Sequence, residues 1–119
     1  MLSDSLKTLL ATSYAFVIKV QNFHWNVEGS NFPQYHTFFD NLQGEVYDNA
    51  IDRTAEYIRT LDAYTPGSIT RYAELSLIPD QLKIPKAHLM MAELYTDNEI
   101  IIKHLNECYA VSEASKQYG

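Results

Sequence analysis

Cysteine is almost absent from this sequence: Cys108 is the only one in 119 residues. An internal disulfide is therefore excluded, and we expect a reducing compartment such as the cytoplasm rather than an exported context. The first residues, MLSDSLKTLLATSYAF, lack the basic segment and the small-residue cleavage site of a signal peptide. No run of about 18 apolar residues occurs, so we expect no membrane-spanning helix and a soluble, cytoplasmic protein.

Basic residues are scarce as well: 9 Lys and Arg stand against 15 Asp and Glu, for a formal net charge of -6. An acidic chain repels the phosphate backbone, which excludes broad electrostatic binding to nucleic acid. Apolar residues are plentiful, at 46% hydrophobic and 13% aromatic. This composition supports a packed core and excludes wholesale disorder. At this length we expect one domain, spanning residues 1–119.

Glycine and proline are also scarce, at 4 residues each. Apart from Gly44 and the terminal Gly119, they gather at three places: residues 29–33, 66–67 and 79–85. Because glycine and proline interrupt regular structure, these places divide the chain into long segments with few internal breakers.

The long segments carry apolar residues at the three- and four-residue steps of an amphipathic helix. In the first segment this stripe comprises Leu6, Leu10, Tyr14 and Val17. The second segment begins after Asn31, which we expect to cap a helix, and Pro33 falls in its first turn. This helix is predicted to continue for roughly 30 residues, to about Tyr64.

The rest of the chain predicts two more helices. Ser68 is expected to cap a short one at residues 69–76, and a last long helix is predicted from near Pro85 onward. The fold class is therefore all-α, with three long helices and a short helix between the second and the third. Three long amphipathic helices need a fourth to complete a bundle. We expect either a partner chain on the open face or a natural protein that continues past Gly119.

Two pairs of potential metal ligands lie on the second helix. His36 and Asp40 are four residues apart, so they share one face of the helix and could hold one ion. Asp52 and Glu56 repeat this spacing. Each pair also has an ordinary interpretation. The two carboxylates would belong to a solvated helix face, since charged residues are mostly exposed, and the histidine would be capped or hydrogen-bonded.

The two pairs cannot bind the same ion within one chain. Their midpoints, residues 38 and 54, lie 16 residues apart, or roughly 24 Å along a helix. They could share an ion if two copies of the helix ran antiparallel across a two-fold axis near residue 46. His36 and Asp40 of one copy would then face Asp52 and Glu56 of the other, twice in each dimer. We therefore expect the chain to associate with itself, at least as a two-fold homodimer.

The angular positions of the two pairs predict a distortion in this helix. From Asp40 to Asp52 is 12 steps, which leaves the two side chains roughly 120° apart around a regular α-helix, whereas 11 steps would leave only about 20°. A π-bulge that absorbs one residue would restore the alignment. We predict a bulge or kink between about Asn41 and Asp48, with Gly44 as the nearest glycine.

His24 is expected at the end of the first helix, ahead of a short turn through Gly29. An antiparallel return of the chain would bring His24 beside His36. Two imidazoles and the carboxylates named above would then form one site with nitrogen and oxygen ligands. Such a site suits Fe, Mn or Zn and suits Mg or Ca poorly.

These residues resemble a known family. The segments HWNVEGSNFPQYHTFFD, DRTAEYIR and TPGSITRYAELS are similar to the Dps group of ferritin-like proteins, the mini-ferritins. The likeness extends over residues 24–77, and the flanking helices agree by pattern. The resemblance implies a ferritin-like helical bundle with a ferroxidase site at the two-fold interface, which oxidises Fe(II) with H₂O₂ or O₂. It also implies iron storage and protection against oxidative stress, with Fe as the metal, and the ligand chemistry above allows Zn or Mn as substitutes.

The resemblance also assigns roles to individual residues. The implied ligands are His24, His36 and Asp40 from one chain and Asp52 and Glu56 from the other. Trp25 matches the aromatic residue beside the site, where the family is thought to quench oxidising by-products. An interface or core anchor is the alternative role for this tryptophan.

Two departures from the family pattern qualify the expected function. The spacing from Asp40 to Asp52 is one residue longer than in the family, so the alternative is a helical assembly module that binds metal without efficient oxidation. The sequence also stops before the family's last helix, so we expect a dodecamer only if a fourth helix is present. Family members that bind DNA often use Lys-rich tails, and MLSDSLK has one lysine, so DNA is not an expected partner.

Overall fold

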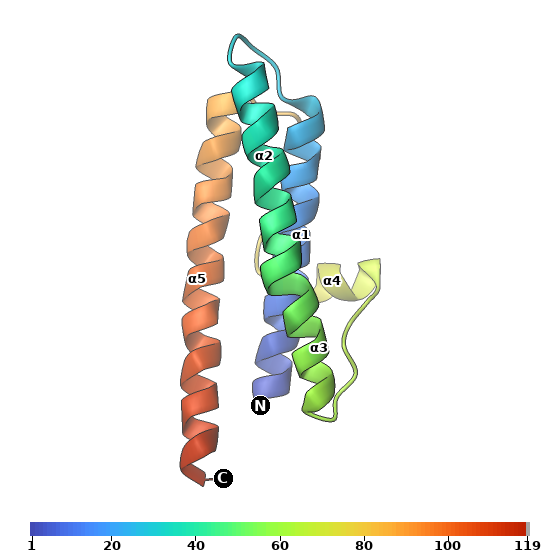
Figure 1. Ribbon diagram of the computed structural model, residues 1–119, viewed down its shortest axis with the longest axis vertical. Coiled ribbons are helices and arrows are strands. Elements are labelled where there is room, and N and C mark those ends of the chain that lie inside the picture. The colour runs from blue at the N-terminus through green and yellow to red at the C-terminus, as the bar shows by residue number, and fades with distance from the viewer. Residues whose placement is uncertain (119) are drawn as a thin grey trace.

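The computed structural model describes residues 1–118, and all of the regular structure in that range is helical. The elements are α1 (Leu2–Asn26), α2 (Phe32–Val46), the π-helical turn η1 (Tyr47–Ile51), α3 (Asp52–Thr60), α4 (Ile69–Leu75) and α5 (Ala87–Tyr118). Figure 1 shows α1 beside the rod formed by α2, η1 and α3, with α5 at the left of the view and α4 at the right. The predicted all-α class and order of helices are confirmed. No described helix combines the length and apolar character needed to cross a membrane.

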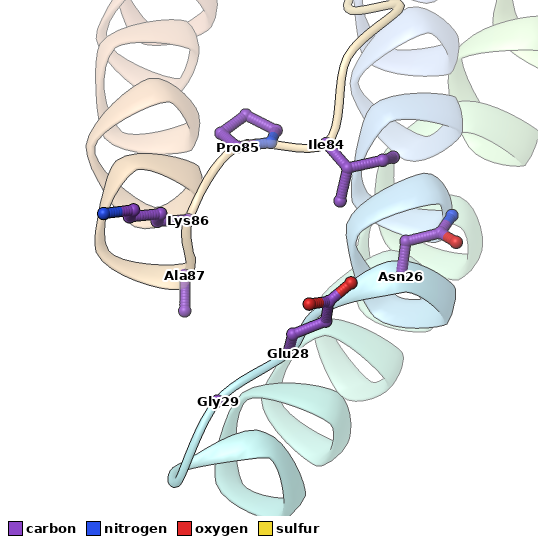
Figure 2. A pocket seen from close by; sticks show the side chains of 7 residues that line it. All are labelled: Asn26, Glu28, Gly29, Ile84, Pro85, Lys86 and Ala87. Carbon is purple, nitrogen blue, oxygen red and sulfur yellow. The ribbon is translucent and has the colours of Figure 1, made fainter.

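A tight turn at Gly29 reverses the chain between α1 and α2. Gly29 has a φ of 110°, a conformation that side-chain-bearing residues rarely adopt. Asn31 occupies the predicted N-cap position, but its side chain makes no capping bond, and its carbonyl accepts the Tyr35 N–H at 3.2 Å instead. The turn and the start of α5 also line a pocket of about 380 Å³, shown in Figure 2. None of the predicted metal ligands lines this pocket.

The predicted bulge exists, and it lies slightly later than expected. The N–H of Asp52 bonds the carbonyl of Tyr47, five residues back, so η1 forms a π turn between two regular α-helical segments. It begins inside the predicted window of residues 41–48 but extends to Ile51, and Gly44 precedes it.

Core packing explains where the bulge lies. Val46 is partly buried against the core, and Ile51 is 4% exposed. Five regular α-helical steps would place these two side chains roughly 140° apart. A π turn that absorbs one residue leaves an angle of only roughly 40° between them. The π turn therefore allows both residues to face the core, and the flexibility of Gly44 is not needed for it.

The long second helix ends at Thr60 rather than near Tyr64. Asp62 has a φ of 60°, in the left-handed region, and a residue in that conformation terminates an α-helix. The short helix α4 starts as predicted, because the Ser68 hydroxyl accepts the Arg71 N–H at 3.2 Å. Tyr72 of α4 stacks on Tyr14 of α1, with ring centroids 4.6 Å apart, which fixes α4 on the bundle.

α1 is the central element of the core. One buried cluster joins it to α2 and α5 and comprises Phe16, Val20, Phe23, Val27, Phe39, Ile78, Met90 and Leu94. A second cluster joins α1 to η1 and α3 and comprises Leu10, Val17, Ile51 and Ile58. Because Phe23 is fully buried, the neighbouring His24 is held at the end of a firmly packed helix.

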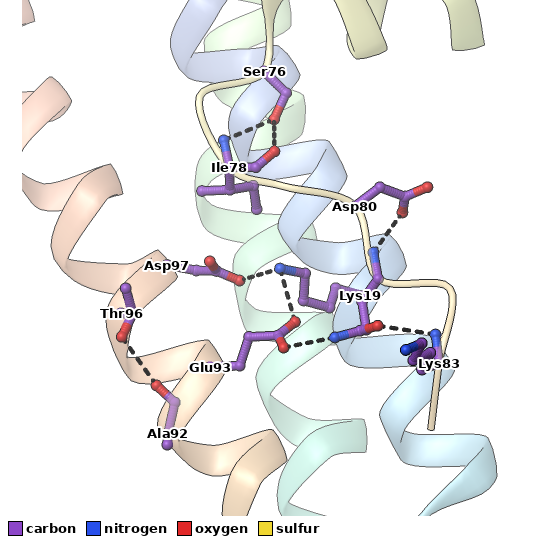
Figure 3. A network of polar contacts seen from close by, with 10 residues as sticks. Lys19, Ser76, Ile78, Asp80, Lys83, Ala92, Glu93, Thr96 and Asp97 are labelled. Carbon is purple, nitrogen blue, oxygen red and sulfur yellow. Dashed lines mark hydrogen bonds and ion pairs between the residues drawn. The ribbon is translucent and has the colours of Figure 1, made fainter. Parts of the chain in front are cut away.

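A buried ionic cluster joins α1 to α5. The Lys19 ammonium lies 2.7 Å from a carboxylate oxygen of Asp97 and 3.0 Å from one of Glu93, and the side chains of Lys19 and Asp97 are each only 2% exposed. Burial raises the pKa of the Asp97 carboxyl above its ordinary value, whereas Lys19 acts to lower it. Figure 3 shows Lys19 between Asp97 and Glu93. Gln81 donates to Glu93 at 2.8 Å, which ties the connection before α5 to the same cluster.

Candidate metal centre

His24 and His36 hold each other in place through their own backbones. His24 lies in the last turn of α1 and His36 in the second turn of α2. The Nδ1 atom of His24 lies 2.7 Å from the carbonyl oxygen of His36, and the Nδ1 atom of His36 lies 2.8 Å from the carbonyl oxygen of His24. The two rings stack with centroids 3.9 Å apart and planes 22° apart. The antiparallel return therefore brings the two imidazoles together, as expected.

These hydrogen bonds determine which nitrogen of each ring is available to a metal ion. A carbonyl oxygen can only accept, so each Nδ1 must carry the proton and donate it. In the neutral ring the lone pair is then on Nε2, which these bonds leave free. Phe32 stacks on the ring of His36 with centroids 5.0 Å apart, and this contact restricts the ring further.

Asp40 adds a carboxylate beside the first imidazole. Its Oδ1 atom lies 3.9 Å from Nε2 of His24, and its side chain is 59% exposed against 14% for His24. An ion bound at about 2.1 Å from each atom can bridge two ligands separated by up to about 4.2 Å. One ion can therefore contact both atoms without a change in this separation. His36 and Asp40 also share one face of α2.

Two glutamines extend this group of side chains, and sequence reasoning did not identify them. Gln43 Nε2 lies 3.3 Å from Asp40 Oδ1, and Gln21 Nε2 lies 3.3 Å from Gln43 Oε1. Their spacing from the predicted ligands could have identified them. Gln43 follows Asp40 by three residues, and Gln21 precedes His24 by three residues, so each lies one turn away on the same helix face.

Asp52 and Glu56 do not join this group within the chain. Both are exposed on α3, beyond η1. In residues 1–118, no three side chains among His, Cys, Asp and Glu converge closely enough to enclose a metal ion. With one residue absorbed in η1, the angle between Asp40 and Asp52 falls from roughly 120° to about 20°. The two carboxylate positions therefore lie on one side of the long helix, well apart along its axis.

Trp25 follows His24 directly at the end of α1. Its side chain is 68% exposed, so it is not part of the core. A role as a core anchor is therefore wrong for the described chain, whereas a role as an interface anchor agrees with this exposure.

The ferritin-like domain model matches residues 3–119, which is nearly the whole chain. An uncharacterized protein of Haemophilus influenzae is 30% identical, over 99% of this chain and 73% of its own length. A low temperature-induced protein of Nostoc is 32% identical, over 82% of this chain. The chain spans about half the length of that relative, 55%.

Solved structures give the same result for the fold. Dps from Staphylococcus aureus superposes with a TM-score of 0.91 at 28% sequence identity, covering 97% of this chain and 76% of that one. The order of helices, the short α4 and the resemblance in residues 24–77 all agree with this match. The chain therefore belongs to the Dps group of the ferritin-like proteins.

Proposed function

We propose that this protein oxidises Fe(II) at a site shared between two copies of the chain, and thereby sequesters iron and limits oxidative damage. Fe(II) is the substrate, and an oxidant, H₂O₂ or O₂, accepts its electrons. The ligands in this proposal are His24, His36 and Asp40 of one copy and Asp52 and Glu56 of the other.

The observation that supports the proposal most is the reciprocal bonding of the two histidines. Each Nδ1 donates to the other residue's carbonyl, which fixes the tautomer and leaves Nε2 free to bind a metal ion. Nitrogen ligands from imidazole together with carboxylate oxygens suit a borderline ion such as Fe(II). A histidine that served only to cap a helix would not need a second histidine to restrict its ring.

The protein's contribution to the reaction is to bind and orient the ions. Each Fe(II) gives up one electron, so two ions reduce one H₂O₂, which takes up two protons and leaves as two water molecules. Asp40 is 59% exposed, and an ion held there is within reach of an oxidant from solution. Carboxylates also favour the product, because Fe(III) carries one more positive charge than Fe(II).

The second half of the proposed site would come from the other end of the long helix. His36 and Asp40 lie before η1, and Asp52 and Glu56 lie after it, roughly 24 Å away along the axis. A two-fold axis near residue 46 would pair the first half of one copy with the second half of the other. The π turn supports this arrangement, because it returns Asp52 to the side of the helix that carries Asp40.

The proposal is tested by adding Fe(II) anaerobically, then H₂O₂ or O₂, and following ferric absorbance. We expect His36→Ala to lose most of the rate, and His88→Ala, at an exposed position on α5, to retain it. Equal rates in the wild type and His36→Ala would exclude this site as the ferroxidase. Binding of Fe(II) without oxidation would instead favour a helical assembly module that only holds metal.

A further inference from the structure

We propose that Gln43 is a positioning residue for Asp40, and that Gln21 in turn fixes the orientation of Gln43. This inference deepens the proposed function, because it concerns how one ligand of that site is held. We call the hydrogen-bonded series Gln21, Gln43 and Asp40 the glutamine relay. It connects α1 to α2 beside the histidine pair.

The relay crosses between the same two helices as the histidine pair, one turn from His24 on α1 and two turns from His36 on α2. Gln21 precedes His24 by three residues, and Gln43 follows Asp40 by three residues. Since α1 and α2 run antiparallel, these positions meet across the same interface, with Nε2 of Gln21 3.3 Å from Oε1 of Gln43. Both glutamines are partly buried, so solvent competes with the bond between them less than at an exposed surface, whereas the bond from Gln43 to Asp40 is exposed.

The carboxylate determines the direction of every bond in the relay. An ionised Asp40 can only accept, so Gln43 must present its NH₂ group to it. The carbonyl oxygen of Gln43 then points to Gln21, which must present its own NH₂ group. An amide at position 21 can donate, and a carboxylate at the same position cannot. The relay therefore has one allowed direction.

The relay matters because Asp40 is otherwise weakly restrained. Its side chain is 59% exposed, and Gln43 is the one described hydrogen-bond donor to its carboxylate. Residues that orient a metal ligand typically change metal affinity by about 10- to 100-fold when they are replaced. Since the bond from Gln43 is 3.3 Å long, we expect Gln43→Met to weaken metal binding by about 10-fold, at the lower end of that range.

Substitutions at position 21 separate the relay from a simple charge effect. Gln21→Met removes the donor, and Gln21→Glu reverses it, because a carboxylate would draw the NH₂ group of Gln43 away from Asp40. We expect Co(II) affinity to decrease in the order wild type, Gln21→Met, Gln21→Glu. A negative charge near a cation site would by itself strengthen binding. Tighter binding by Gln21→Glu than by the wild type would therefore overturn the relay.

Co(II) is titrated anaerobically into the full chain, and its visible absorption spectrum reports the ligand geometry. Gln34→Met and Gln34→Glu are matched controls, because Gln34 is an exposed glutamine on the same helix that takes no part in the relay. Both controls should bind Co(II) with the wild-type affinity and spectrum. Gln43→Met should change both, while its helix content and thermal unfolding stay within the range of the controls.

A second measurement decides the relay without any metal. In the metal-free protein, the side-chain amide resonances of Gln43 should shift in Gln21→Met, because the bond to its carbonyl oxygen is lost. Unchanged Gln43 resonances would overturn the relay even if the site binds Co(II). If the wild type binds no Co(II), the proposed function fails, and the Gln43 resonances still decide the relay.

Discussion

The π turn η1 can be tested by changing the length of the helix by one residue. In the first variant Asn49 is deleted, and in the second an alanine is inserted after Asn49. Asn49 is exposed, and its side chain donates only to the carbonyl of Glu45, so its loss should cost little. Deletion leaves 11 steps between Asp40 and Asp52, so the two residues lie about 20° apart around an undistorted α-helix. Insertion leaves 13 steps, of which one π turn absorbs one, for a misalignment of roughly 120°.

These rotations move the ligand atoms by distances that can be compared with the tolerance of a metal site. A side-chain ligand lies about 5 Å from the helix axis, given a helix diameter of 10–12 Å. A rotation of about 20° moves it by about 2 Å, and a rotation of about 120° moves it by about 9 Å. Metal–ligand distances tolerate changes of only about 0.2 Å. Side-chain rotation can correct the first displacement, and it cannot correct the second.

We expect the deletion variant to bind Co(II) and oxidise Fe(II) at close to the wild-type rate, and the insertion variant to lose both. Light scattering at matched concentrations would show whether each variant still associates. The deletion also preserves the core, because Val46 and Ile51 become four residues apart and stay on one face. Wild-type activity in the insertion variant, or lost activity in a folded deletion variant, would refute the reasoning.

Three further predictions concern stability and partners. Lys19→Met should lower the free energy of unfolding by about 3–5 kcal/mol at pH 7, because it leaves buried Asp97 without its cation. In chemical denaturation this loss of unfolding free energy should shrink as the pH falls toward about 3.9, because the raised folded-state pKa of Asp97 favours its protonated, uncharged form. A loss that does not change with pH would contradict this. Gly29→Ala should cost at least about 1 kcal/mol in the same assay, since φ there is 110°, whereas an unchanged midpoint would show that the turn adapts. In a gel shift at low salt we expect no retardation of DNA, given the net charge of -6, and a clear shift would reveal a cationic surface.

Much of the fold could be predicted from local patterns. Apolar spacing gave the helices, and Ser68 marked the start of α4 correctly because an N-cap bond is made within four residues. The end of α3 was placed too late, because aspartate is enriched in the left-handed conformation that Asp62 adopts but most aspartates do not adopt it. The existence of the π turn followed from the spacing of Asp40 and Asp52. Its location did not, because contacts with α1, which are distant in sequence, decide where Ile51 must face.

The candidate site was predicted to a similar degree. The pairing of His24 with His36 followed from the Gly29 turn, but the exchange of hydrogen bonds between their backbones did not, since it depends on how closely α1 and α2 approach. The two glutamines of the relay were missed because an amide is not a preferred ligand of Fe, Mn or Zn, so nothing singled them out in the sequence. The roles of Asp52 and Glu56 depend on a second copy of the chain, and they stay a prediction.

The central position of α1 has a consequence for how the protein opens. α1 packs against α2, η1, α3, α4 and α5, so its backbone can exchange amide hydrogens only when most of the structure unfolds. α4, which packs mainly on α1, can detach at much lower free energy. Amide protection should therefore be highest in the middle of α1 and low in α4. The histidine pair joins the last turn of α1 to α2 and makes no bond to α4, so its geometry should persist through the local fluctuations that expose α4.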